Sequence, residues 1–162
     1  MALFRDAIFD RLLAALNAGT KPAGVPACVD SLTYSLDPDQ LPKVTLSYKQ
    51  DEPERVGGRR GPIIKRRLIL TIEVWTTSTA AVASPPAAAL TARDNAEPIL
   101  AWVSKAIGAV DVALPTRVAH DPLDEGMTTW LQGNDGEVPV CLATVEVLAS
   151  YQTRSDNAEA WA

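Results

Sequence analysis

The stretch "IIKRRLILTIEVWTT", residues 63–77, carries the strongest strand signal of this chain. Side chains of a β-strand alternate between the two faces of a sheet. One face of this stretch carries only aliphatic residues, namely Leu68, Leu70, Ile72 and Val74. The other face carries Ile69, Thr71, Glu73 and Trp75. Apolar residues on both sides are typical of a strand in the interior of a sheet. We therefore predict a central strand that is covered on much of both faces.

The preceding segment predicts the partner strand of a hairpin. In "KVTLSYK", residues 43–49, Val44, Leu46 and Tyr48 alternate with polar residues. The intervening residues, about 50–62, contain three glycines and many charges. Connections of this length are often functional. We predict a long β-hairpin arm at about residues 50–62.

Two helices are expected to pack on the sheet. The first lies near the N-terminus, where apolar residues recur at helical spacing: Phe4, Ile8, Phe9, Leu12, Leu13 and Leu16. The second is expected over about Asn95–Ile107, with Asp94 or Asn95 as its cap, because Pro98 is best tolerated in a first turn. Pro85 and Pro86 argue against a continuous helix before it. Residues 79–92 are therefore predicted to be a linker or long loop.

Further strands are expected before and after these elements. Alternating patterns indicate strands over Cys28–Leu36, Thr116–His120, Met127–Leu131 and Val140–Tyr151, with a polar loop "HDPLDEG" at residues 120–126. The order α-β-β-β-α-β-β-β predicts an α+β fold: a mainly antiparallel mixed β-sheet with two helices packed on it. We expect one domain over residues 1–153 and a polar C-terminal tail over residues 154–162.

Positive charge is concentrated in one part of an acidic chain. The formal net charge is −5, which argues against a protein that coats nucleic acid. The basic residues of the 55–67 stretch are Arg55, Arg59, Arg60, Lys65, Arg66 and Arg67. They could serve a protein-docking or pore-lining arm, a solvated loop without a partner, or a nucleic-acid-binding module. Because no aromatic residues interleave them for base stacking, we favour the arm.

No catalytic constellation is evident. His120 with Asp121, Asp124 and Glu125 could form a metal site, but Asp-Pro turns place acids on surfaces for conformational reasons alone. The segment "GGRRG" leads into a strand, whereas phosphate-cradling loops lead to a helix N-terminus. We expect no enzyme activity, cofactor or metal.

Three further features bear on partners and location. Cys28 and Cys141 are far apart and are expected to be two buried thiols in strands of a reduced cytosolic protein. We find no signal peptide and no apolar run long enough to span a membrane. Trp161, next to the end of the polar tail, either anchors to a neighbouring subunit or is unordered.

The layout resembles the tail terminator (minor tail protein U-like) family of long-tailed bacteriophages and prophages. Three segments carry the resemblance: "LSYKQDEPERVGGRRGPIIKRRLILTIEVW" (46–75), "DNAEPILAWVSKAI" (94–107) and "ATVEVLASYQTRSDNA" (143–158). The most suggestive pieces are "RRLILTIEVW" and the final strand running out through Tyr151, Gln152 and Thr153 toward an aspartate. The Ala/Pro-rich residues 79–92 depart from the family pattern.

The resemblance implies a structural virion protein of the head-proximal end of the tail, assembled in the host cytoplasm. Such subunits form a ring, expected to be hexameric, that caps the tail tube, stops its growth and joins the head. The implied partners are the tail tube protein and a head-completion or neck protein, with DNA only passing non-specifically through the lumen. The arm would face the lumen or the tube, and we expect Asp121, Asp124, Glu125 and Trp161 to contact neighbouring subunits. Another neck or tail-completion protein of similar fold remains an alternative.

Overall fold

Five strands form one sheet, and they comprise β1 (Val29–Asp30), β2 (Lys43–Pro53), β3 (Ile63–Thr77), β4 (Asp121–Asp135) and β5 (Val138–Arg154). The computed structural model describes residues 4–30, 40–53, 63–78, 85–113, 121–135 and 138–154. The strand order is β1-β2-β3-β5-β4. Only β1 and β2 are parallel neighbours, and the other three pairs are antiparallel. The predicted α+β class with a mainly antiparallel mixed sheet is confirmed.

Strand β3 lies at the centre of the sheet, as its sequence predicts. It pairs with β5 along its whole length, from Ile63 opposite Arg154 to Thr77 opposite Val140. Four of its aliphatic side chains are fully buried on one face: Leu68, Leu70, Ile72 and Val74. We call this the helix face, and the opposite side, with Ile69 and Trp75, the outer face. Ile69 and Trp75 are half-buried.

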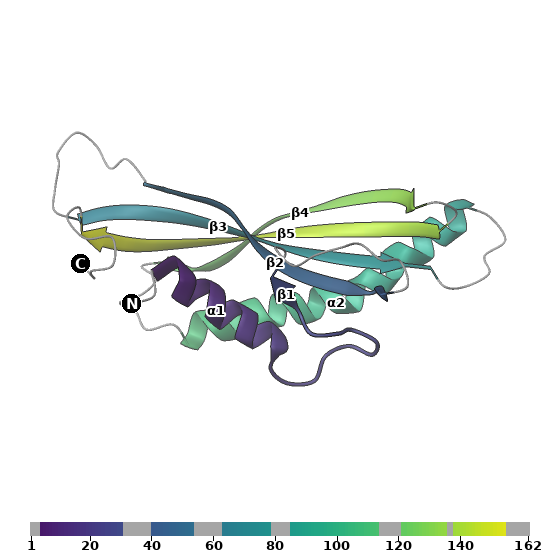
Figure 1. Ribbon diagram of the computed structural model, residues 1–162, viewed down its shortest axis with the longest axis horizontal. Coiled ribbons are helices and arrows are strands. Elements are labelled where there is room, and N and C mark those ends of the chain that lie inside the picture. Colours follow the sequence, from purple (N-terminus) through teal and green to yellow (C-terminus); the bar gives the residue numbers. More distant parts are fainter. Residues whose placement is uncertain are drawn as a thin grey trace.

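Both helices, α1 (Phe4–Asn17) and α2 (Pro85–Ala113), lie on the helix face (Figure 1). No described helix covers the outer face. Thr71 on that face is nevertheless 9% exposed and its outer-face neighbours on β3 are half-buried, in agreement with the expected coverage of much of both faces. The buried residues of α1 are Ile8, Phe9, Leu12 and Leu16, which confirms its predicted amphipathic pattern. Phe9 stacks on Tyr48 of β2 with ring centroids 4.5 Å apart. The core therefore forms between one face of the sheet and the two helices.

Helix α2 is much longer than the sequence pattern indicates. The prediction of a loop over residues 79–92 is wrong for its second half, because the helix begins at Pro85. Pro85 and Pro86 occupy the first turn, where backbone N–H groups need no partner within the helix. Pro98 lies inside the helix on its exposed side and does not end it. Residues 79–84 lie outside the described chain.

Strand β4 also differs from expectation. Residues 121–126 were predicted to be a polar loop, but they belong to a strand that runs from Asp121 to Asp135 and includes the predicted Met127–Leu131 segment. Its pairing with β5 is interrupted twice, between Asp121 and Asp124 and between Glu125 and Thr128. These irregularities explain why the segment lacks the alternation that marks a regular strand.

The remaining strand predictions are tested in part. The final strand is confirmed and extends over Val138–Arg154. For the predicted strand Cys28–Leu36, the structure describes β1 at Val29–Asp30, and residues 31–39 lie outside the described chain. The predicted strand Thr116–His120 also lies outside it. Both cysteine thiols are free and buried, in agreement with expectation: Cys141 within β5 and Cys28 directly before β1.

Candidate functional site

The predicted arm meets the sheet where β2 ends and β3 begins. The hairpin strands continue further than expected, because Gln50–Pro53 belong to β2 and pair with residues 66–69 of β3. The predicted loop therefore loses its first four residues to the strand, and residues 54–62 lie outside the described chain. Arg55, Arg59 and Arg60 fall in that gap. Lys65, Arg66 and Arg67 lie in β3, which agrees with the prediction that residues 63–67 begin the central strand.

Arg66 belongs to an ion-paired cluster at this end of the sheet, which we call the arm-base cluster: Arg5, Asp51, Arg66 and Tyr151. The Arg66 Nε donates to Asp51 Oδ1 over 3.1 Å. The Tyr151 hydroxyl donates to Asp51 Oδ2 over 2.8 Å. Arg5 of α1 approaches the same carboxylate at 3.9 Å. The Asp51 side chain is only 14% exposed, so this carboxylate links β2, β3, β5 and α1 in a partly dry environment.

The position of Asp51 depends on an irregularity in β2. Tyr48 pairs with Leu70, but the next pair is Gln50 with Ile69, so Lys49 is an extra residue in this strand. Such a β-bulge changes which residues of the strand point to each face. Asp51 consequently lies opposite Leu68 and points to the helix face. With regular alternation from Tyr48 onward it would point to the outer face, away from Tyr151 and Arg5.

Electrostatics favour the protonated form of the tyrosine in this cluster. Burial and the hydrogen bond to Asp51 raise the pKa of Tyr151 to about 12. The Tyr151 hydroxyl donates its proton to the Asp51 carboxylate, which also binds the Arg66 guanidinium. Tyr151 is only 4% exposed. A phenol held neutral in this way is not activated as a nucleophile or a base. The arrangement fixes the strands in place and offers no reacting centre.

The outer face at the same end carries the remaining strand cations. Arg67 is exposed and lies directly opposite Glu52 of β2. Lys65 is half-buried and pairs in register with Gln152 of β5. Of the three described basic residues of the 55–67 stretch, Arg67 is the one that is exposed.

The acidic residues that we expected at subunit contacts lie two strands away on β4. Asp121 pairs with Ser150 of β5, and Ser150 also pairs with Arg67 of β3. The structure thus brings the acidic and basic sets to the same end of one sheet. Asp124 and Glu125 are exposed on β4. Trp161 lies outside the described chain.

Metal-ligating residues do not gather in the described parts of the chain. No group of three or more histidine, cysteine or carboxylate side chains is close enough there to hold a metal ion. His120, the residue around which a metal site could be imagined, falls outside those parts. Within the same residues, no helix has the length and hydropathy needed to cross a bilayer.

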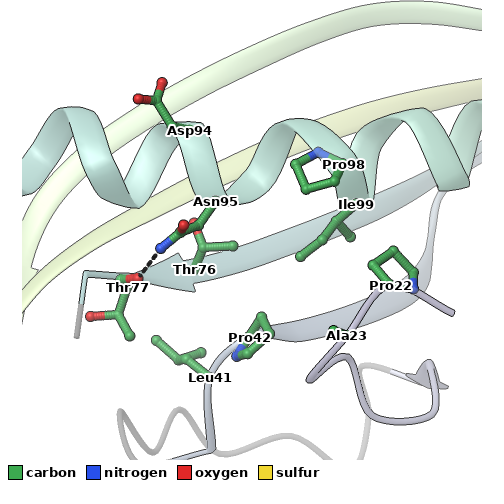
Figure 2. A pocket seen from close by; sticks show the side chains of 10 residues that line it. All are labelled: Pro22, Ala23, Leu41, Pro42, Thr76, Thr77, Asp94, Asn95, Pro98 and Ile99. Atoms are coloured by element: carbon green, nitrogen blue, oxygen red, sulfur yellow. Dashed lines mark hydrogen bonds between the residues drawn. The ribbon is translucent and has the colours of Figure 1, made fainter. Parts of the chain in front are cut away.

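A groove at the opposite end of the sheet was not predicted. It has a volume of about 560 Å³ and lies between α2, the end of β3 and the segments before β1 and β2 (Figure 2). Its lining comprises Pro22, Ala23, Leu41, Pro42, Thr76, Thr77, Asp94, Asn95, Pro98 and Ile99. The Asn95 amide donates to the Thr77 carbonyl over 2.9 Å across one wall. The mainly apolar wall carries no pair of groups suited to acid–base chemistry.

Sequence reasoning missed Asp51, Tyr151 and Arg5 as members of one cluster. Asp51 was included in the predicted loop, since a bulge leaves no residue-level signature in this strand. Tyr151 stood at the end of the final strand without an assigned partner. The strand pattern contains an indication of this cluster. Arg66 lies two residues before Leu68 and four before Leu70, so its side chain points to the same helix face. A cation buried on that face requires a counter-ion.

Comparisons with known proteins do not assign a family. No protein-family model matches the chain, and no curated protein matches its sequence at a significant level.

Proposed function

We propose that this protein is a structural subunit of a long-tailed phage or prophage: a tail terminator that forms a ring on the head-proximal end of the tail tube. The ring, which we expect to be hexameric, would stop polymerisation of the tube and present a surface to a head-completion or neck protein. The protein would belong to the virion and assemble in the host cytoplasm. The proposal includes no catalytic role and no cofactor.

The observation that carries this proposal is the projecting end of the sheet. Figure 1 shows β3 and β5 continuing past the amino end of α1. The basic 55–67 stretch leads into this end of β3, while the rest of the subunit is acidic overall. A two-stranded extension with cations at its end suits insertion into a neighbouring component better than catalysis. In a ring, such extensions would contact DNA phosphates without reading bases.

The arm-base cluster divides the basic residues by role. Arg66 is paired with Asp51 inside the subunit and holds the base of the arm. Contacts with other molecules are therefore assigned to Arg55, Arg59, Arg60 and Arg67. This division also weakens the alternative of a nucleic-acid-binding module, because one cation of the stretch is already neutralised.

The test is a tube-capping assay. Purified protein is added to tail tube protein of the same phage during polymerisation, and tube lengths are measured by negative-stain electron microscopy. We expect tubes to stop growing and to carry a ring at one end. Continued growth at every protein concentration contradicts the proposal.

A matched pair of variants tests the role of the arm. Arg59→Ala with Arg60→Ala should weaken capping, whereas Glu97→Ala, an exposed charge change on α2, should leave it unchanged. Filter binding of the free subunit to DNA at moderate salt provides the contrast. Tight binding that the double arginine variant abolishes, together with intact tube growth, would favour the nucleic-acid-binding module instead.

A further inference from the structure

The groove between α2 and the end of β3 has the size and the wall of a binding site. Pro22, Pro42, Pro98 and Ile99 give it a mainly apolar lining (Figure 2). Its volume of about 560 Å³ lies within the range of about 300–1,000 Å³ that is usual for sites that hold small organic molecules. One aromatic side chain is smaller than such a molecule and therefore fits.

Asn95 adds a directed polar group to this apolar wall. The amide nitrogen donates to the Thr77 carbonyl over 2.9 Å, which fixes the orientation of the side chain. The amide oxygen remains an acceptor. A tryptophan side chain has an apolar body and one N–H donor, and this donor needs an acceptor when the ring is buried. The groove therefore matches an indole ring better than a purely apolar side chain.

One tryptophan of the chain has no assigned place in the folded subunit. Trp75 and Trp102 are half-buried, and the Arg93 guanidinium lies over the Trp130 ring at 5.3 Å. Trp161 follows the last strand in the polar segment "SDNAEAWA". Tryptophan is among the residue types most enriched at the energetic centres of protein interfaces. Trp161 is thus the candidate to fill the groove.

The length of the chain prevents Trp161 from reaching the groove of its own subunit. Arg154 lies opposite Ile63 at the arm end of the sheet, whereas Thr76 in the groove wall lies 13 positions after Ile63 on β3. A strand rises about 3.3 Å per residue, so the two ends are about 43 Å apart. Trp161 is seven residues beyond Arg154, and seven extended residues span at most about 25 Å. A Trp161 that occupies this groove therefore belongs to another copy.

Charge favours the approach of the segment that carries the tryptophan. Between the last strand and Trp161, this segment contains Asp156 and Glu159 and no cation. Two lysines, Lys21 and Lys43, each adjoin a proline of the groove lining. Asp94 also belongs to the lining, but Figure 2 shows its carboxylate pointing away from the other labelled side chains. Opposite charges on two surfaces steer their encounter and fix their register.

We propose that Trp161 of one copy of this chain inserts its indole ring into the groove between α2 and β3 of a second copy, where the indole N–H donates to the Asn95 amide oxygen. The contact joins the arm end of one subunit to the opposite end of another. Because two different surfaces meet, such contacts can continue from copy to copy around a ring. The inference goes beyond the proposed function, since it states how copies join and not what the assembly caps.

Disulfide trapping between two single-cysteine variants tests this contact. One full-length variant carries Ala160→Cys, beside the tryptophan, and the other carries Ala23→Cys, in the groove lining. Tags of different mass distinguish the two chains. The native Cys28 and Cys141 are buried, at 3% and 0% exposed. Mild oxidation of the mixture should give a mixed disulfide-linked dimer on a non-reducing gel, since a disulfide forms only when the two Cα atoms come within about 7 Å.

Control variants separate a specific contact from random collision. Ala14→Cys, at an exposed alanine of α1, replaces Ala23→Cys and should give several-fold less mixed dimer. Adding Trp161→Ala to the Ala160→Cys chain should reduce the product with Ala23→Cys to the control level, and Trp161→Phe should retain part of it. Equal yields from the two alanine positions, or a yield that Trp161→Ala leaves unchanged, would overturn the inference.

Light scattering provides a second readout on the chain without added cysteines. Trp161→Ala should lower the oligomer mass, and Trp161→Phe should lower it less. An unchanged mass in Trp161→Ala counts against the contact. The capping assay keeps the two proposals apart: capped tubes without the mixed disulfide overturn only this contact, whereas the expected disulfide in a protein that does not stop tube growth contradicts only the terminator function.

Discussion

Asp51 connects more parts of the molecule than any other side chain of the arm-base cluster. Its two carboxylate oxygens accept hydrogen bonds from Arg66 on β3 and Tyr151 on β5. Arg5 extends the same ionic contact to the first helix. Removing one partner of a buried charge pair is more damaging than removing the pair, because the remaining charge loses its compensation. The cluster therefore depends on the single acid.

We predict that Asp51→Ala destabilises the protein by about 2–4 kcal/mol, because the guanidinium and the phenol both lose their acceptor. Tyr151→Phe, which removes one hydrogen bond and keeps the ring, should cost about 0.5–1.5 kcal/mol. Glu52→Ala is the matched control, since Glu52 adjoins Asp51 but is exposed, and it should change stability by less than about 0.5 kcal/mol. Urea unfolding followed by circular dichroism measures all three. Equal losses for Asp51→Ala and Glu52→Ala would show that the cluster is not stabilising.

Cys28 gives the stability a pH dependence in the alkaline range. Burial raises the pKa of its thiol from 9.0 to about 12. The unfolded chain therefore releases this proton at lower pH than the folded chain does. The contribution of this thiol to the free energy of unfolding is fully present below pH 9 and is lost as the pH rises toward 12. The loss is at most about 1.4 kcal/mol per pH unit for one group.

We predict that the urea midpoint of the native chain falls between pH 8 and pH 10.5, and that Cys28→Ala reduces the slope. Cys141 and Tyr151 act in the same direction, since the pKa of each is also raised, so the contribution of Cys28 is the difference in slope between the native chain and Cys28→Ala. The measurement is a series of urea titrations at fixed ionic strength. Parallel midpoint curves for the two proteins would contradict the assignment.

At the scale of the element, β2 shows how one extra residue changes the partners of a strand. The residues before the bulge alternate as the sequence predicts, and Tyr48 stacks on Phe9 of α1. After Lys49 the odd-numbered residues of β2 point to the helix face in place of the even-numbered ones, so Asp51 and Pro53 lie on that face. Lys49 itself binds Glu146 on the outer face. Lys49 has no Cα partner on β3. The pairs Tyr48–Leu70 and Gln50–Ile69 on either side of it can therefore form without Lys49.

Deletion of Lys49 should therefore be tolerated, with a loss of no more than about 1 kcal/mol from the exposed ion pair and the altered bulge. Deletion of Ser47 is the matched control. It would shift Tyr48 to the outer face and Lys49 to the helix face, which we expect to cost several kcal/mol. Thermal unfolding of both variants checks the prediction. A larger loss for the Lys49 deletion would show that the bulge itself is required.

Elements also show where sequence reasoning succeeded and where it failed. The β3 segment was predicted correctly because its alternation continues over many residues and is reinforced by burial. The predicted helix is shorter than α2 because first-turn tolerance of Pro98 predicts a start near Asn95, whereas burial of Ala96, Ile99 and Val103 stabilises the helix on both sides of Pro98. Strand β4 was missed at its start because its two register breaks remove the alternating pattern. Prediction of the arm-base cluster would have required the register of β2, β3 and β5, and a local sequence pattern does not determine the register between strands.

At the scale of the whole molecule, the sheet should be most stable at its centre. Strands β3 and β5 pair over 15 residue positions, whereas β1 pairs with β2 at two positions among the residues that the structure describes. Backbone hydrogen bonds that open only with global unfolding exchange most slowly. We predict that amides of β3 and β5 exchange slower than those of β1 and β4 by about tenfold or more. Hydrogen–deuterium exchange with mass spectrometry checks this, and faster exchange in β3 than in β4 would contradict it.

The overall class follows from the sequence, whereas the asymmetry of the molecule does not. The alternating and helical spacings of apolar residues predict an α+β fold with a sheet and two helices. They do not predict that both helices pack on the same face of the sheet. That choice leaves the outer face with a mixture of threonines, charges and half-buried apolar residues. It also means that the candidate interfaces lie at the ends of the sheet, which are defined by strand order and not by any local motif.

The pairing of β3 with β5 has a consequence for biosynthesis. Ile63 finds its partner Arg154 more than half of the chain length later. A nascent chain leaving the ribosome holds β2 and β3 before β5 exists, so the sheet lacks its second central strand until residues 138–154 have been made. Contacts between distant segments also slow folding, since a long loop must close before they form. Completion of the sheet should therefore lag well behind the synthesis of β2 and β3, which separates the synthesis of the central strand in time from the completion of the fold.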